Sequence, residues 1–198
     1  MRTKSCVTVT AVFTLCTLFA PLSTLKAQTM PAPADVPVHL ATPQVSPAEV
    51  YAKLLSGQAE EVVSAAEAMP ADKYNFAPTA GDFKGVRTFG EQITHIAGAQ
   101  YYFFDGFGIK PTIDQDGLKK LTGKDEIVQA LKDSFAFAHQ AVETMTEQNA
   151  FQKIADRDGT DTRASITAFS LAHTNDHYGQ MIEYLRMNGI VPPASRKP

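Results

Sequence analysis

Four long segments with apolar residues at helical spacing constrain this 198-residue chain more than any other feature. The first opens at Ser46-Pro47-Ala48-Glu49, with Ser as cap, Pro at the first helical position and Glu three residues after the cap. A second capping box, Thr88-Phe89-Gly90-Glu91, opens the next segment. The chain has no convincing strand and no internal repeat. The sequence therefore predicts an all-α protein, a four-helix bundle.

The expected helices are bounded by these caps and by the breakers that follow them: 46–69, 89–104, 124–145 and 162–188. The expected apolar stripe of the first helix includes Val50 and Leu54, and that of the last includes Phe169. Residues 71–86 are expected to form a polar loop. Residues 105–123 are too irregular for one helix, and they form either part of a substrate rim or an ordinary long connection.

Two histidines in the last segment, His173 and His177, are the first candidates for function. Side chains four residues apart lie one above the other on a helix, so the two imidazoles can bind one metal ion from one rigid element. The alternative is that both are hydrogen-bonded core or polar-face histidines. A third histidine, His95, borders the apolar stripe of the second helix and completes a three-histidine set from two helices.

Glu91 lies four residues before His95 and has two possible roles. It completes the capping box at Thr88, or it accepts a hydrogen bond from the non-ligating nitrogen of His95, as carboxylates around metal-bound histidines do. The cap is the favoured role, since the motif is complete without a metal. His139, beside the stripe of the third helix, has no partner in the sequence pattern and is interpreted as structural or exposed.

In three ordered segments the chain resembles the DinB/YfiT-like superfamily of metalloenzymes. These segments are MPADKYNFAPT (69–79), RTFGEQITHIAGA (87–99) and HTNDHYGQMIEYLRMNGIVPP (173–193). The resemblance implies a four-helix bundle in which His95, His173 and His177 hold one metal ion. It also places a Gly-Gln pair, Gly179 and Gln180, after the last ligand.

Characterised members of that family include thiol-dependent S-transferases, a thiol-dependent isomerase and metal-dependent hydrolases. Three neutral imidazoles leave a coordination position for water or substrate, which is typical of a catalytic zinc site. Zinc is the expected ion, and nickel and ferrous iron remain open because softer ligands are absent. Gln180 is the candidate catalytic residue as a substrate-orienting group; its alternative is a hydrogen bond within the bundle. The expected activity is hydrolysis of an unknown small molecule, with an S-transferase or a non-catalytic metal-binding module as alternatives.

The N-terminus predicts export. Residues 1–27 combine Arg2 and Lys4 with a short apolar run and a cleavage site before Gln28, as in a secretory signal peptide; an uncleaved anchor is the alternative. Both cysteines of the chain, Cys6 and Cys16, fall in this segment, so the mature protein would have no disulfide and no thiolate ligand. Residues 28–45 are Pro-rich and are expected to be a disordered linker, followed by the bundle at 46–198. The expected location is periplasmic or extracellular.

Charge excludes one class of partner. Without residues 1–27 the chain has 15 basic and 21 acidic residues, a net charge of −6, and no basic cluster interleaved with aromatic residues. Nucleic-acid binding therefore has no electrostatic support. The expected partner is a small-molecule substrate. No membrane association is expected after signal cleavage, and the sequence leaves open whether the protein forms a homodimer.

Overall fold

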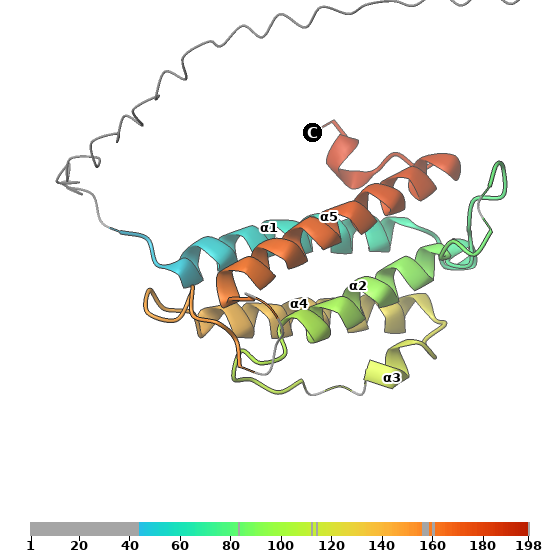
Figure 1. The fold of residues 1–198 in the computed structure, drawn as a ribbon. Helices are drawn as coiled ribbons and strands as arrows, with labels where there is room; N and C mark the ends of the chain where they lie inside the picture. The colour runs from blue at the N-terminus through green and yellow to red at the C-terminus, as the bar shows by residue number, and fades with distance from the viewer. Residues whose placement is uncertain are drawn as a thin grey trace, which may run out of the picture. The chain divides into compact units, whose positions relative to one another are not determined.

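The computed structural model describes residues 44–82, 84–111, 113, 115–155, 159 and 161–197. The predicted signal peptide and all of the predicted linker except residues 44 and 45 lie outside the described residues. Four long helices and three short ones make up the described part of the chain. The four long helices form a bundle (Figure 1). The bounds of the helices are α1 Pro47–Ala68, η1 Ala71–Lys73, α2 Phe89–Phe103, α3 Gln115–Leu118, α4 Lys124–Glu143, α5 Arg163–Met187 and η2 Pro193–Ser195.

Local sequence determines where the long helices begin. The Ser46 hydroxyl accepts from the Glu49 amide while the Glu49 carboxylate accepts from the Ser46 amide, and Thr88 and Glu91 repeat the arrangement at α2. Thr162 and Ser165 close a third reciprocal cap at α5. These side chains satisfy amide groups that the first turn of a helix leaves without partners. The all-α bundle expected from the sequence is therefore confirmed, and the long helices agree with prediction to within two residues at each end.

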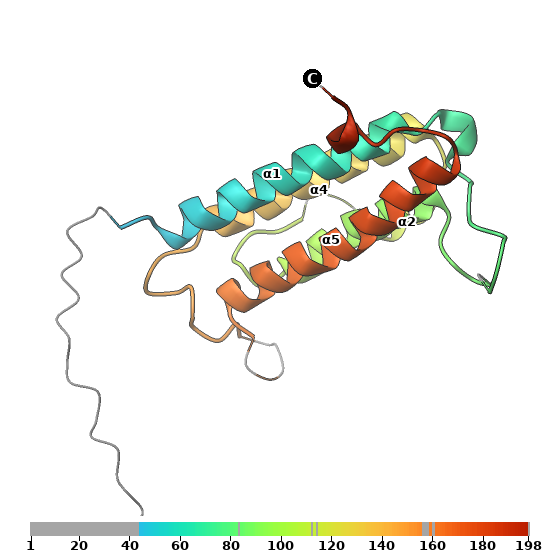
Figure 2. The same ribbon diagram turned by 90° about the horizontal axis from the view of Figure 1, so that it is seen from above.

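The four long helices pack in a closed ring in which α1 contacts α4 and α5, and α2 contacts α4 and α5. Helices α1 and α5 run in one direction and α2 and α4 in the other, as the colour gradient shows (Figures 1 and 2). Since α2 and α4 are parallel, the chain must return along the bundle between them. That return carries α3, which packs against α2.

The buried surface of two helices is narrower than the apolar stripe predicted for them. Val50 and Leu54 of α1 are 44% and 50% exposed, and Phe169 of α5 is 57% exposed. The prediction that they face the core was wrong. A helix in a four-membered ring contacts only its neighbours, so residues at the edge of a wide stripe remain in solvent.

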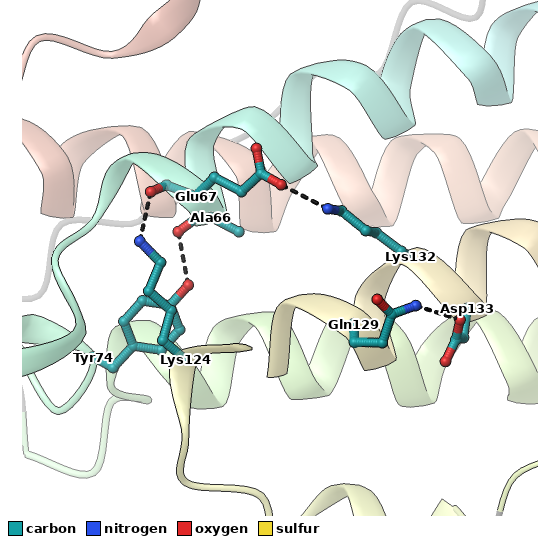
Figure 3. A network of polar contacts seen from close by, with 7 residues as sticks. All are labelled: Ala66, Glu67, Tyr74, Lys124, Gln129, Lys132 and Asp133. Atoms are coloured by element: carbon teal, nitrogen blue, oxygen red, sulfur yellow. Dashed lines mark hydrogen bonds and ion pairs between the residues drawn. The ribbon is translucent and has the colours of Figure 1, made fainter. Parts of the chain in front are cut away.

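The loop between α1 and α2 is less polar than expected. Tyr74 is buried, stacks edge-to-face on Phe89 at 5.4 Å, and donates from its hydroxyl to the Ala66 carbonyl oxygen at 2.7 Å. Close by, Lys124 at the start of α4 donates to the carbonyl oxygen of Glu67 at the end of α1 (Figure 3). It also donates to the carbonyl oxygen of Met69. Lys124 thus connects this end of α1 to the start of α4, and Tyr74 connects the loop to the same end of α1.

Among the residues that the structure describes, no helix is long and apolar enough to cross a membrane.

Candidate metal centre

His95 of α2 and His173 and His177 of α5 converge on one point between the two helices. One ring nitrogen from each lies within 4.8 Å of those of the other two, so the three side chains could hold a metal ion. The ring centroids of His95 are 5.2 Å from His173 and 4.6 Å from His177. The three histidines that the sequence grouped into one set therefore lie together in the structure.

The spacing of the two α5 histidines matches a shared ion. His173 Nε2 and His177 Nε2 are 3.2 Å apart. Two nitrogens bound tetrahedrally at about 2.0–2.1 Å lie about 3.3 Å apart, so these atoms need little movement to bind one ion. The residues present therefore fit a divalent metal.

A chain of amides fixes the tautomer of His177. The Asp176 carboxylate can only accept, so it orients Gln180 with its amide nitrogen toward Asp176 Oδ2 at 3.3 Å. The Gln180 oxygen then accepts from Gln92 Nε2 at 2.7 Å, which turns the Gln92 oxygen toward His177 Nδ1 at 2.9 Å. His177 Nδ1 must therefore carry the proton and donate it. The lone pair of His177 Nε2 can then bind a metal. A hydrogen bond from the other ring nitrogen commonly orients a metal-binding histidine in this way.

His173 is oriented by packing instead. Its ring lies edge-to-face on Phe103, with centroids 5.1 Å apart, and near Phe169 at 6.3 Å. Its Nδ1 is buried and has no hydrogen-bond partner among the described residues. The two ligands from one helix are thus held by different means, His177 by hydrogen bonds and His173 by aromatic contact.

Further polar contacts continue along the same seam between α2 and α5. Gln100 accepts from the Ser170 hydroxyl at 2.9 Å and donates to the Thr174 hydroxyl at 3.3 Å. All three side chains are essentially inaccessible to solvent. Since a buried polar group is costly unless it is hydrogen-bonded, these pairs fix the alignment of α2 against α5 and with it the position of the histidines.

The environment keeps the three imidazoles neutral. Burial, followed by the nearby Arg87 charge and the other two histidines, lowers the pKa of His95 to about 4. Burial also lowers the pKa of His173, and it lowers the pKa of His177 together with the neighbouring His173. Neutral imidazole is the form that binds metal, so all three are ready to ligate at neutral pH.

A cavity of about 1030 Å³ borders the centre, and His95 and His173 lie in its wall. The first turns of α2, the last turn of α2 and the α5 residue Phe169 form other parts of the wall. Residues 85–87, just before α2, also belong to the wall, as do Asp116, Leu118 and Lys119 of the connection between α2 and α4. Part of that connection therefore lines the cavity, and its role as a substrate rim stays a prediction.

The remaining predicted site residues lie around this centre. Glu91 accepts from the Thr88 amide at 2.7 Å, and its side chain also lines the cavity. Gln180 is half-buried and bonded to Gln92, and it is not among the residues lining the cavity. The roles predicted for Glu91 toward His95 and for Gln180 in catalysis stay predictions. The sequence did not predict the hydrogen bond between Gln92 and His177. Its signal in the sequence is an amide side chain on the buried face of α2.

His139 lies away from the centre, on α4. Its Nε2 is 2.7 Å from the Ser56 hydroxyl of α1, and its Nδ1 is 3.8 Å from Glu143. It contributes a contact between α1 and α4, in keeping with the structural role predicted for it.

A sequence comparison agrees with this geometry. The sequence pattern of the DinB superfamily matches residues 54–181, more than half of the chain, and the match includes all three histidines. The chain therefore belongs to the DinB superfamily, whose members bind metal. No curated protein matches the chain.

Proposed function

We propose that this protein is a metal-dependent hydrolase acting on a small molecule, with its divalent ion on His95, His173 and His177. The observation that carries the proposal is that three neutral imidazoles converge beside a large cavity, with His95 and His173 in its wall. Three protein ligands leave a tetrahedral ion one further position, which is the layout of catalytic zinc sites. When bound, a divalent ion supplies a Lewis acid and lowers the pKa of water toward neutrality.

The chain's own residues would have separate tasks. His177, held in one tautomer through Gln92, fixes one donor direction, and His173 is held against Phe103. His95 brings the third donor from α2 to the cavity wall. Gln180 helps to orient His177 through its hydrogen bond to Gln92. We also propose that Gln180 orients the substrate by direct contact. Zinc is the ion that we propose, with nickel and ferrous iron as alternatives.

Hydrolysis is preferred to thiol transfer because we also propose that the chain is exported. Residues 1–27 have the composition of a cleaved signal peptide, and cytosolic low-molecular-weight thiols would be scarce outside the cytoplasm. In the native host the mature protein should begin near Gln28. Its intact mass tests this, and recovery of the full-length chain from the cytosol would contradict it.

Metal content and turnover test the function itself. Protein purified without a histidine tag should contain one divalent ion per chain, and chelation should abolish hydrolysis of model esters while helical circular dichroism persists. The helices carry their own caps and apolar core, so the fold should survive metal removal. One bound ion without hydrolysis of esters, amides or lactones would make the protein a non-catalytic metal-binding module. Turnover that appears only with an added thiol would favour the transferase.

A further inference from the structure

The residues that line the cavity beside the three histidines change from charged to aromatic along α2. Arg87 lies just before the helix, Glu91 in its first turn and His95 in its middle. Tyr102 and Phe103 lie in its last turn. With a rise of about 1.5 Å per residue, Glu91 and Tyr102 are about 16 Å apart along the axis, and His95 lies between them. A ligand along this face would meet charge at one end, the metal centre next, and aromatic rings at the other end.

The aromatic end is unusually exposed for such large side chains. Tyr102 is 65% exposed and Phe169 is 57% exposed. Phe103 is buried beneath them and makes edge-to-face contacts with Phe169 at 5.4 Å and with Tyr102 at 5.7 Å. Phe103 also contacts His173, so this surface runs directly into the metal centre. An apolar group of a ligand that covers it would be stabilised by removal of ring surface from water.

Gly98 forms the middle of the cavity wall. It lies one turn after His95 in the cavity wall, opposite Leu118 of α3, and a Cβ atom there would be 3.8 Å from the leucine Cδ1. A larger side chain would occupy the space between α2 and α3. The wall beside His95 therefore carries no side chain at this position.

Arg87 dominates the charged end. Its carbonyl oxygen is fixed by the Tyr184 hydroxyl at 3.0 Å, while its side chain is exposed in the cavity wall without an ion-pair partner among the described residues. Its charge acts on all three histidines, which places it within electrostatic reach of the centre. Guanidinium groups bind planar carboxylates with two parallel hydrogen bonds.

The other charges on the wall do not cancel this preference. Glu91 has one carboxylate oxygen committed to the Thr88 amide, and Asp116 and Lys119 on the α3 side are of opposite sign. Arg87 and Lys119 therefore balance Glu91 and Asp116 in formal charge. A divalent ion on three neutral imidazoles makes the cavity net positive, which favours an anion.

We propose that this cavity takes a small amphipathic carboxylate. The carboxylate binds Arg87, the apolar or aromatic group lies over Phe103 and Phe169, and the reacting bond lies between them beside His95 and His173. This inference rests on the proposed function for the reaction, whereas the binding preference can be measured without turnover.

Isothermal titration with phenylacetate, 3-phenylpropionate and 4-phenylbutyrate tests the proposal. Each acid is compared with its neutral carboxamide and with the alkanoate of equal length that lacks the ring, in zinc-loaded and in chelated protein. The best acid should bind about 10-fold more tightly than its carboxamide, the size expected of one charge-assisted contact. It should exceed the ring-free alkanoate by about 10-fold or more, from burial of the ring.

Two variants assign these preferences, each with a matched control. Arg87→Gln should remove the preference for carboxylate over carboxamide, whereas Lys119→Gln should keep it. Phe169→Ala should remove the preference for the ring, whereas Phe151→Ala, which alters an 80% exposed phenylalanine outside the cavity wall, should keep it. Circular dichroism of each variant identifies any loss of fold, and Arg87→Lys and Phe169→Leu then serve as milder replacements.

The outcomes separate this inference from the proposed function. Equal binding of acid and carboxamide, or of ring and ring-free compounds, would overturn the inference even if esters are hydrolysed. A carboxylate preference that needs zinc and survives Arg87→Gln would assign the anion to the metal and also overturn it. The expected preferences in a protein without hydrolytic activity would instead support the cavity assignment and contradict the hydrolase.

Discussion

The seam between α2 and α5 differs in chemistry from the seam between α1 and α4. Between α2 and α5 the buried side chains include Gln92, Gln100, Thr174 and His177, each hydrogen-bonded across the seam. Helices α1 and α4 instead share apolar core clusters, one of which includes Val62 and Leu131. The polar contacts between α1 and α4 in the described part of the chain lie at the edges, as with the exposed Glu67–Lys132 pair (Figure 3).

The two seams contribute differently to the stability of the bundle and to its function. Burial of apolar surface stabilises the fold but does not select one helix alignment, because its free energy depends on area rather than on the orientation of single groups. Buried amides and imidazoles contribute little net stability but define one alignment, since a partner lost in the interior leaves a costly unsatisfied group. The α2–α5 seam is therefore the part of the bundle built to position ligands, and the α1–α4 seam holds the helices together.

The largest expected effect is the loss of a metal ligand. His177→Ala should weaken zinc binding by more than about 100-fold, because outer partners alone account for about 10–100-fold. Competition with a chromophoric chelator measures it. His139→Ala is the matched control on the other seam and should leave zinc binding unchanged; equal losses in both variants would break the distinction between the seams.

Removal of Gln92 should have the next largest effect. Gln92→Leu leaves His177 Nδ1 without its acceptor, and zinc affinity should fall by about 10–100-fold. Gln92→Glu retains an oxygen acceptor and should restore much of the affinity, which a purely structural role would not explain. Gln129→Leu, at an exposed glutamine bonded to Asp133 on α4, provides the control. Unchanged zinc binding in Gln92→Leu would contradict the orienting role.

Acid should destabilise the metal-free protein through the α2–α5 seam. Folding lowers the pKa of His95 to about 4 from an unfolded value of about 6.5. Between these two pKa values the unfolded chain binds more protons than the folded chain. The free energy of unfolding is therefore highest above the unfolded pKa and falls as the pH drops toward the folded pKa. Thermal melts of chelated protein between pH 7 and pH 4 should show the decline, reduced in His95→Gln. Equal declines in the two proteins would assign the acid sensitivity to other groups.

The smallest effect is expected at the exposed edge of the α1–α4 seam. Lys132 and Glu67 are 2.7 Å apart, but their side chains are 45% and 50% exposed. Lys132→Met should therefore change the free energy of unfolding by at most about 1 kcal/mol, and zinc binding should stay the same. Urea denaturation measures the first and chelator competition the second. A large change in stability would show that this edge carries more of the fold than its exposure indicates.

The sequence by itself determined the helices and two of the three candidate ligands. Caps such as Ser46 with Glu49 act over three residues, and His173 and His177 share a face because of helical periodicity alone. These interactions are local, so the order of residues is enough to predict them. The third histidine, His95, was found through its place on a second helix and through the family resemblance.

Only the tertiary structure decided what surrounds those ligands. Gln92 and His177 are 85 residues apart in the chain, and their contact depends on how α2 aligns with α5. Phe169, predicted to be buried, instead lines the cavity. Lys119 of the α2–α4 connection also lines it. Periodicity shows which face of a helix is apolar but not how much of that face a neighbour covers. That coverage is set by the packing of helices distant in sequence, so the metal ligands could be predicted and the cavity beside them could not.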